Sequence, residues 1–508
     1  MAHALSASAL LPLLTLLSSF VAGLAIFLLR EQQARLRTTL NLGAALVKLG
    51  CVAAMLWGTA HGVHYELRLP LLPGNDLLLR ADPLALLFVT LSAGLWLLTT
   101  VYAIGYLEGS PHRSRFFGFF SLCVTATVGI AMAGNLVTFF LFYELLTLAT
   151  YPLVVHRGTP QALAAGARYL AYTLGGGAVL LAGIVWLQAL AGPVEFAAGG
   201  VLRALDPAQH GALAAIFAVL IAGLGVKAAL VPLHAWLPQA MVAPAPVSAL
   251  LHAVAVVKAG AFGIVRVVYE VYGIEFAHTL GLLLPLAAVA AVTILFGSLR
   301  ALAQDDLKRR LAYSTVSQVS YIVLGTALFG PIGTVGGLVH LVHQGVMKIT
   351  LFFCAGNYAE TLGIHRVSEM AGVGRRMPWT TAAFSVGALG MIGLPPVAGF
   401  VSKWHLGLGA IDAGMPWALA VLLASSLLNA AYFLPILRTA WFDAPPPHWP
   451  HEHIAARPGA ETSRWLLWPT VAGAILALAA GSSASLPGSP LGWAQMIAER
   501  EYAGHGGR

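Results

Sequence analysis

Two histidines and a lysine are grouped in the apolar stretch GGLVHLVHQGVMKITLFFCAG. His340, Gln344 and Lys348 are spaced four residues apart, which places them on one face of a helix, with His343 beside them. Histidine titrates near neutral pH and is suited to passing protons. A single buried histidine is usually a hydrogen-bonded core residue, but two with a lysine on one face favour proton transfer. Metal binding is the weaker interpretation, because no carboxylate or cysteine joins them.

A carboxylate lies in the middle of a second apolar stretch, NLVTFFLFYELLTLATYPLVV. Glu144 shares one helical face with Thr147 and Tyr151, so this helix is expected to have a single polar stripe. The alternative is a structural carboxylate bound to a neighbouring helix. Because burying a charge merely to pack two helices is unfavourable, we favour a functional role.

Lys227 lies inside the stretch LIAGLGVKAALVPLHAWLPQAM and is followed by Pro232 and Pro238. Proline within a helix breaks it and leaves backbone carbonyls that must find other partners. A charged residue beside a broken helix is typical of ion pathways in transporters. A lysine that merely reaches a membrane surface is disfavoured, because Lys227 is far from both ends of the stretch.

A second broken helix with a lysine is predicted in MIGLPPVAGFVSKWHLGLGAI, where Lys403 follows Pro395 and Pro396. Broken helices at corresponding positions in two halves of a chain indicate an inverted repeat. Simple translation does not align these two halves, since Lys227 precedes its prolines and Lys403 follows them.

Lys258 and His252 lie in the stretch between these two breaks, in APAPVSALLHAVAVVKAGAFGIVR. His252 shares a helical face with Ser248, but Lys258 points away from that face on an ideal helix. A kink or bridging water is therefore needed to place His252 and Lys258 on one pathway.

The composition shows which elements must position these residues. The chain has 508 residues, of which 58% are hydrophobic and only 9% charged, against roughly 25% charged in soluble domains. A spanning helix needs roughly 20 apolar residues, and this template predicts about fourteen spans. They cover approximately residues 5–29, 38–60, 83–107, 114–133, 135–156, 165–191, 210–238, 244–270, 279–300, 307–329, 332–359, 378–410, 414–440 and 464–482. The sequence therefore predicts an all-α, polytopic membrane protein with broken helices at spans 7 and 12.

Lysine and arginine are divided unequally between the loops. Seventeen follow odd-numbered predicted spans, whereas five lie in the other loops and the C-terminal tail (Arg68, Arg80, Arg203, Arg500 and Arg508). Because basic loops remain in the cytoplasm, both termini are expected outside it. The apolar N-terminal stretch has no basic residue before it and no small-residue cleavage site, so it is interpreted as the first span.

No cofactor or metal is predicted. The three cysteines each lie inside an apolar stretch (Cys51, Cys123 and Cys354), so neither a disulfide framework nor a four-thiolate site is expected. The sequence also has no phosphate-binding or dinucleotide-binding glycine motif.

Two further features have weaker interpretations. The loop HWPHEH places His448, His451 and His453 close together, but metal binding is disfavoured because the loop is proline-rich and exposed. Lys48 lies in the second predicted span, where it is expected either to extend to the membrane surface or to face a neighbouring protein of a complex.

Three stretches resemble a known family: HAWLPQAMVAPAPVSALLHAVAVVKAGAFGIVR, QDDLKRRLAYSTVSQVSYI and GLPPVAGFVSKW. They are similar to the antiporter-like, proton-translocating subunits of respiratory complex I, Mrp-type sodium/proton antiporters and group 4 membrane-bound hydrogenases. The resemblance covers roughly residues 80–440. The sequences of these motifs are most similar to those of the D-type component of Mrp antiporters and its hydrogenase relatives.

The resemblance implies fourteen helices with two inverted five-helix repeats, spans 4–8 and 9–13, and no redox centre. The chain would divide into N-terminal helices (1–110), a first half-channel (111–272), a second half-channel (273–440) and a cytoplasmic loop, last helix and tail (441–508). By motif, the first half-channel would hold Glu144 with Lys227, Lys258 with the nearby His252 would be the central relay, and the second would hold His340, His343, Lys348 and the terminal Lys403.

The family also implies partners: other membrane subunits of a hetero-oligomeric complex in the inner membrane of a prokaryote, with protons, and with or without Na⁺, as cargo. No nucleic acid is implied. The alternatives are a structural subunit, a transporter of a small organic substrate, and a membrane subunit of an inorganic-carbon-accumulating assembly.

Overall fold

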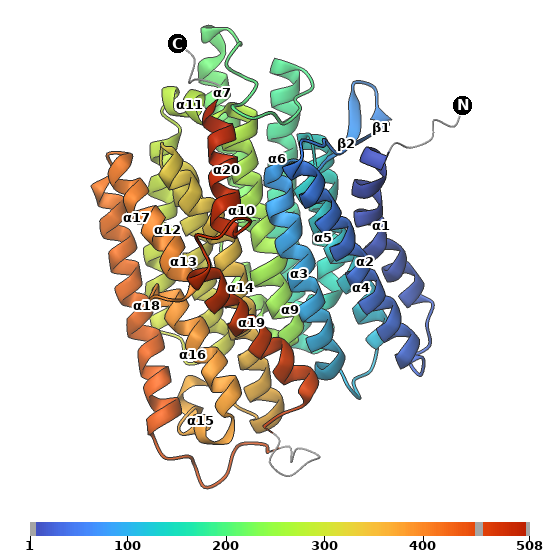
Figure 1. Cartoon of the computed structure of the whole chain (residues 1–508), viewed down its shortest axis with the longest axis vertical. Coiled ribbons are helices and arrows are strands. Elements are labelled where there is room, and N and C mark those ends of the chain that lie inside the picture. The colour runs from blue at the N-terminus through green and yellow to red at the C-terminus, as the bar shows by residue number, and fades with distance from the viewer. Residues whose placement is uncertain (1–6, 453–460, 504–508) are drawn as a thin grey trace.

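The computed structural model describes residues 7–452 and 461–503 of the chain, so His453 and Arg508 lie outside the described residues. It is a bundle of long, roughly parallel and antiparallel helices (Figure 1). The first half of the bundle contains α1 (Ala7–Phe27), α2 (Ala34–Ala60), α3 (Pro83–Tyr106), α4 (Arg113–Met132), α5 (Leu136–Val154), α6 (Pro160–Ala191), α7 (His210–Lys227), α8 (Trp236–Gln239), α9 (Ala245–Ala249), α10 (Val256–Arg266) and α11 (Ile274–Thr279). The second contains α12 (Leu283–Leu302), α13 (Leu307–Ala327), α14 (Pro331–Leu362), α15 (Val373–Arg376), α16 (Pro378–Ile392), α17 (Ala398–Asp412), α18 (Pro416–Phe442), α19 (Arg464–Ser482) and α20 (Pro490–Tyr502).

The short η elements either connect helices or interrupt them. They are the 3₁₀ turns η1 (Pro207–Gln209), η2 (Ala240–Val242) and η5 (Val367–Glu369), and the π-helical turns η3 (Leu250–Val254) and η4 (Val267–Tyr272).

Among the described residues, twelve helices are long and apolar enough to cross a membrane. Two predicted spans are not among them. The stretch 307–329 forms α13, which is long enough but rich in Ser, Thr and Gln, and 378–410 is divided into the shorter helices α16 and α17. The all-α polytopic fold is therefore confirmed, while the count of fourteen and the repeat boundaries stay predictions.

One β-hairpin interrupts the helical fold, and the sequence analysis missed it. Strands β1 (Glu66–Leu72) and β2 (Asn75–Arg80) pair antiparallel, with Glu66 opposite Arg80. Gly74 has a positive φ of 78°, which suits the tight turn between the strands. The hairpin lies at the upper end of the bundle in Figure 1, where α1 begins and α20 ends. We refer to this end as the upper end and to the opposite one as the lower end.

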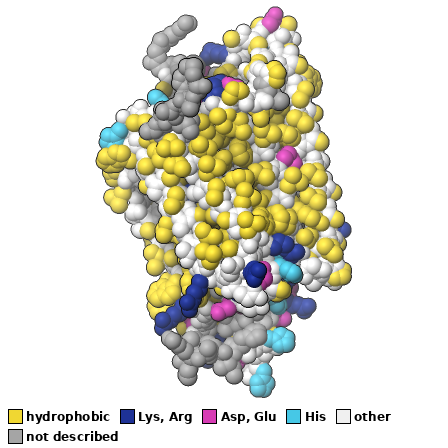
Figure 2. All heavy atoms as spheres, turned by 90° about the vertical axis from the view of Figure 1, so that its right-hand side faces the viewer, with side chains coloured by type: hydrophobic (Ala, Val, Ile, Leu, Met, Phe, Trp, Pro, Cys, Tyr) yellow, Lys and Arg dark blue, Asp and Glu magenta, His cyan; other side chains and the backbone are white. Residues whose placement is uncertain are grey.

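The centre of the bundle consists of α14 and the helical stretch Ala245–Tyr272, whose most apolar windows are entirely buried. Peripheral helices such as α2, α6, α18 and α19 bury only about a third of theirs. A broad hydrophobic surface lies between two ends that carry charged and histidine side chains (Figure 2). This pattern is what a bilayer requires of a spanning protein, because lipid covers the outer faces and the central helices contact only protein.

Candidate functional site

The first predicted break occurs directly after Lys227. Helix α7 ends at this residue, and the chain is irregular until α8 begins at Trp236. Pro232 lies within the irregular segment, whereas Pro238 lies in the short helix α8 that follows it. Lys227 is completely buried, so its ammonium group sits inside the protein at the end of a broken helix.

Lys227 contacts α5 through Tyr143 and forms no direct pair with Glu144. Its Nζ donates a hydrogen bond to the carbonyl oxygen of Tyr143 and lies 3.3 Å from the centre of the Tyr143 ring. Among the described residues, no ion pair within 4.0 Å joins Lys227 to Glu144, and Oε1 of Glu144 has no hydrogen-bond partner. The Glu144 carboxylate instead packs against Gly177 of α6. The structure therefore brings the two predicted partners into one neighbourhood, where Lys227 donates to the residue that precedes Glu144.

The sequence left open a kink or bridging water between His252 and Lys258, and the structure has the π-helical turn η3 at Leu250–Val254. The Ala255 amide donates to the carbonyl of Leu250, 2.9 Å away, and the α-helix resumes at Val256. The extra residue of a π turn rotates the side chains that follow it, and such turns are frequent at functional sites. Both ring nitrogens of His252 are buried and have no hydrogen-bond partner in the described part of the chain.

Lys258 connects the two halves of the bundle. It is completely buried, and its Nζ donates to the carbonyl oxygen of Leu341 on α14 at 2.7 Å, next to His340. Two residues further on, Gly260 packs directly against the backbone of Ala228 in the break after Lys227. A side chain at position 260 would prevent this approach of α10 to α7.

The polar face of α14 continues from this point. Nδ1 of His340 and Oγ of Ser402 are 2.8 Å apart, and Ser402 Oγ donates to the carbonyl of Gly399 at 3.2 Å. Ser402 therefore accepts from His340, which leaves Nε2 of His340 as an open acceptor. Lys348, two turns further along α14, donates to the carbonyl of Leu311 at 3.2 Å.

The second predicted break lies between α16 and α17 and contains Pro395 and Pro396. Lys403 reaches back to the open end of α16, where its Nζ donates to the carbonyls of Met391 (2.8 Å) and Ile392 (3.1 Å). The last carbonyls of a helix have no partner within it, so Lys403 satisfies two of them. Lys403 also lines a cavity of about 700 Å³ between α16, α17 and α18.

Tyr321 of α13 connects Lys403 with His340, and the sequence analysis missed it. Its ring centre lies 5.1 Å from Nζ of Lys403 and 5.2 Å from the centre of the His340 ring, and no described residue forms a hydrogen bond with its hydroxyl. We use the name polar line for five residues: Lys227, Lys258, His340, Tyr321 and Lys403. The packing of Gly260 on the Ala228 backbone brings the helices of the first two together, and the contacts above relate the other residues.

Several other buried polar atoms have no hydrogen-bond partner among the described residues. They belong to His252, Gln318, His343 and Gln344 and are completely buried. Buried polar atoms are normally hydrogen-bonded, and in a roomy polar interior the partner is ordered water. These side chains are therefore suited to line internal water that connects the residues of the polar line.

The expectations for Lys48 were wrong, because it neither extends to the membrane surface nor lies on an exposed face. It is completely buried and donates to the Thr15 carbonyl and to Ser19 Oγ, both at 2.8 Å, with the Trp96 ring 5.2 Å away. Its partners belong to α1 and α3, far from the polar line in sequence and contacts.

The sequence analysis also missed a buried ion cluster at the upper end of α10. Arg266 is completely buried and pairs with Asp82 of α3 and with Glu270, one turn further along its own helix. Asp82 and Arg266 are 184 residues apart in sequence, so no local pattern could join them. In the whole described part of the chain, this cluster included, no three His, Cys, Asp or Glu side chains are placed to hold a metal ion.

Comparison with known proteins identifies the family. Residues 133–429 match the model of the transmembrane region of NADH:quinone oxidoreductase and Mrp antiporters, and residues 75–117 match that of the complex I chain 5 N-terminus. The NADH-quinone oxidoreductase N subunit of Desulforudis audaxviator is 38% identical over 405 residues, which are 79% of this chain and 80% of that protein. The D component of the Na(+)/H(+) antiporter of Bacillus subtilis is 29% identical, with 80% of each chain covered.

Solved structures agree with this result. A chain of the Mrp complex from Dietzia sp. superposes with a TM-score of 0.86 at 25% identity, covering 98% of both chains. A chain of respiratory complex I from Thermus thermophilus superposes with a TM-score of 0.78 at 23% identity and shares the fold over 96% of this chain. The chain therefore belongs to the family of antiporter-like membrane subunits that NADH:quinone oxidoreductases share with Mrp antiporters.

Proposed function

We propose that this protein translocates protons, with or without Na⁺ in exchange, as one membrane subunit of a hetero-oligomeric complex in the cytoplasmic membrane of a prokaryote. The observation that carries the proposal is the set of lysines in the polar line, of which Lys227 and Lys258 are completely buried and Lys403 is partly buried. None of the three has a carboxylate within 4.0 Å among the described residues. Ionisable groups inside a membrane protein usually mark ion or proton pathways.

The partners of these lysines suit a change of protonation. A carbonyl oxygen accepts a hydrogen bond from a neutral amine as well as from an ammonium group, whereas a paired carboxylate would hold the charged form. Each lysine can therefore give up its proton without leaving a buried anion behind. The neighbouring unpartnered histidine and glutamine side chains would support the water that carries the proton onward.

Glu144 supplies an adjustable charge at the start of the polar line. At 4 Å and an effective dielectric constant near 20, a carboxylate and an ammonium group attract each other by about 4 kcal/mol. That energy corresponds to roughly a thousandfold change in proton affinity. A small movement of Glu144 toward Lys227, past Tyr143, would load the lysine, and withdrawal toward Gly177 would release its proton. Moving one charge across 100 mV costs about 2.3 kcal/mol, so the switch has a useful size.

The proposal is tested by replacing Lys227 in the assembled complex. Lys227→Met should abolish proton uptake by reconstituted vesicles while the complex still assembles. Lys48→Met is the matched control, because Lys48 is equally buried but lies outside the polar line. If Lys227→Met transports protons as the wild type does, Lys227 is structural and the pathway is wrong.

The same vesicles separate the remaining alternatives. Proton uptake that requires Na⁺ on the opposite side indicates exchange, and uptake that does not require it indicates proton movement alone. A structural subunit would leave transport insensitive to every substitution in the polar line at matched assembly. A transporter of an organic substrate or of inorganic carbon would instead show proton uptake only when that substrate is present.

A further inference from the structure

A group of buried charges lies at the upper end of the molecule, apart from the polar line. Asp82 caps the start of α3, where it accepts from the Ala85 amide at 2.7 Å. Arg266 binds both carboxylate oxygens of Asp82, at 2.8 and 3.2 Å, and also contacts Glu270. Two-point binding of this kind holds a guanidinium group firmly, so Arg266 fixes the position of both acids.

The C-terminal helix α20 completes this group. Arg500 lies 3.8 Å from Oε1 of Glu270, and that oxygen has no hydrogen-bond partner. Glu501 is only 2% exposed; its Oε2 accepts from the Gly199 amide at 3.0 Å, while its Oε1 has no partner. Two buried carboxylates therefore each keep one oxygen atom without a hydrogen bond from any described residue.

The charges of this group do not balance. The ionisable groups that face Glu501 come from α3, from α10 with η4, and from α20: Asp82, Arg266, Tyr269, Glu270, Arg500 and Tyr502. Tyrosine is neutral near pH 7 and arginine stays protonated, so within the described residues, which end at 503, three carboxylates face two positive charges. Burying one uncompensated charge is costly, and adjacent carboxylates respond by sharing a proton. The two oxygen atoms without a hydrogen bond are where that proton can bind.

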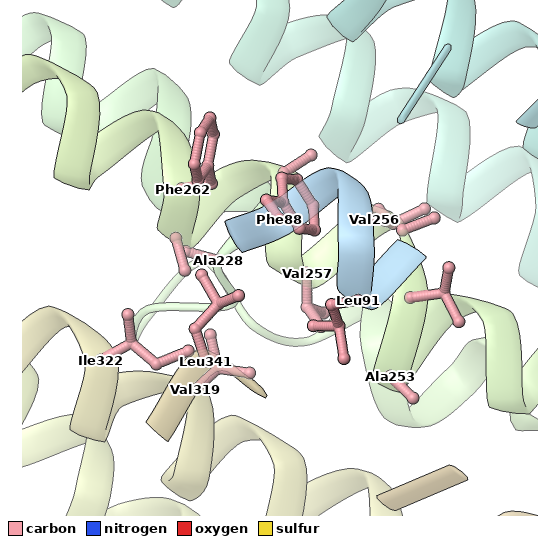
Figure 3. Packing of buried hydrophobic residues seen from close by; sticks show 14 of the residues in the cluster. Phe88, Leu91, Ala228, Ala253, Val256, Val257, Phe262, Val319, Ile322 and Leu341 are labelled. Carbon is pink, nitrogen blue, oxygen red and sulfur yellow. The ribbon is translucent and has the colours of Figure 1, made fainter. Parts of the chain in front are cut away.

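An apolar layer separates this group from the polar line. Phe262 lies on α10 midway between Lys258 and Arg266, which are eight residues or about 12 Å apart along the helix. Its ring packs on Phe88 at 4.8 Å between ring centres, inside a cluster of buried apolar side chains that also contains Leu341 and Val257 (Figure 3). The Phe88–Phe262 pair therefore keeps Lys258 and the upper charges in separate polar regions.

We propose that Glu270 and Glu501, positioned by Arg266 and Arg500, form a single proton-binding site at the upper end of the molecule. In the proton pathway, this site would exchange protons with Lys258 when the Phe88–Phe262 layer opens. This role rests on the proposed function above. Helix α20 would then supply part of the pathway, although it lies outside the helices that the sequence analysis assigned to it.

The site is tested in the assembled complex by infrared titration and by counting protons. The wild type should show a band of a protonated carboxyl group that Glu501→Gln removes, together with the loss of about one bound proton per chain. Glu499→Gln is the control, because Glu499 is exposed on the same helix, and it should keep both signals. If the band and the proton count of Glu501→Gln equal those of the wild type, the site does not exist.

A second variant keeps the test conclusive if the Glu501→Gln complex does not assemble. Glu501→Asp keeps a carboxyl group and should shift the band without removing it; an assembled Glu501→Asp complex without any change in the band would also overturn the site. The proposed function is tested separately, because it would fail if the Lys227→Met complex transported protons at the wild-type rate. If the proton-binding site lies on the transport route, Glu501→Gln should also lower the transport rate, whereas Glu499→Gln should not. Equal transport rates of the two variants would show that the site is not part of the proton pathway.

Discussion

Each lysine of the polar line donates to backbone carbonyls, and this choice of partner determines which substitutions are informative. Lys258 is the clearest case, because a single carbonyl, that of Leu341, accepts from its Nζ. A side chain that keeps the positive charge but cannot release a proton would preserve this hydrogen bond and still block a relay. Charge and proton transfer can thus be separated at one position.

Lys258→Arg should retain the fold and lose most of the transport, because arginine does not deprotonate in proteins. We expect a loss of roughly 10²-fold, the lower end of what a proton-transferring group contributes. Lys258→His can titrate and should retain more activity than the arginine variant. The measurement is the transport rate in vesicles at matched assembly. Near-normal rates for Lys258→Arg would mean that Lys258 supplies only a fixed charge.

The position of Glu144 depends on the absence of a side chain at Gly177. A Cβ there would collide with the Glu144 carboxylate, so Gly177→Ala should displace the carboxylate and lower transport several-fold. Gly175→Ala is the control, because nothing lies within 4 Å of a Cβ at that position of the same helix. Alanine favours a helix by about 1 kcal/mol over glycine, so neither variant should lose stability through its backbone. Equal transport by the two variants would show that Glu144 need not lie there.

At the scale of elements, both helix breaks could be predicted from the prolines. The positions of the side chains around the breaks could not be predicted. Pro232 and Pro395 indicated irregular backbone beside Lys227 and Lys403, and the structure has it there. The π turn between His252 and Lys258 left no such sign, since its residues are ordinary helix formers. Tyr321 and Arg266 were missed because their partners come from distant parts of the chain.

The missed β-hairpin had a local signal. The residues ELRLPLLPGNDLLLR contain Pro-Gly-Asn between two short stretches that partly alternate charged and apolar side chains. The apolar composition of the whole chain predicts a loop between spans here, because the hairpin pattern is short and only partly alternating. Its contact with the loop after α6 is equally invisible in sequence, because Glu195 meets Arg68 and Arg80 only in the folded protein.

This contact predicts a pH dependence of the hairpin. Hydrogen bonds from Arg68 and then Arg80 outweigh partial burial and lower the pKa of Glu195. The stabilisation that follows from a lowered pKa is complete above the ordinary glutamate value of about 4.3 and is lost as the pH falls through the lower, folded-state value. The pairs are half exposed, so the effect is at most about 1 kcal/mol.

The expected result is faster hydrogen exchange at the Phe196 amide in acid, after correction for the intrinsic rate. That amide donates to the Gly134 carbonyl at 2.8 Å and reports on the loop that holds Glu195. Glu195→Gln should remove the extra pH dependence, whereas Glu108→Gln, at the lower end, should keep it. Identical profiles for wild type and Glu195→Gln would contradict the role of this carboxylate.

At the scale of the whole molecule, the charged loops of the two ends differ in sign of charge and in composition. The lower end carries Lys308, Arg309 and Arg310 in the first turn of α13, and the segment between α14 and α16 adds further arginines; Arg310 also binds the Gln304 carbonyl at 2.8 Å. The upper end carries the hairpin and the buried acids around Glu270. An apolar surface separates the two ends (Figure 2). The orientation with the lower end outside the cytoplasm would require the basic loops to cross the membrane, which is unfavourable.

We therefore predict that the upper end, with the start of α1 and the end of α20, lies outside the cytoplasm. An alkaline phosphatase fused after Tyr502 should be active, because the enzyme folds in oxidising surroundings, and a fluorescent protein that matures only in the cytoplasm should stay dark there. Fusions after Glu31, in the basic loop between α1 and α2, should give the opposite pair of signals. The two positions lie at opposite ends of the bundle (Figure 1), so each is the control for the other. Phosphatase activity after Glu31 together with fluorescence after Tyr502 would reverse the orientation, and the proton-binding site at Glu270 and Glu501 would then face the cytoplasm.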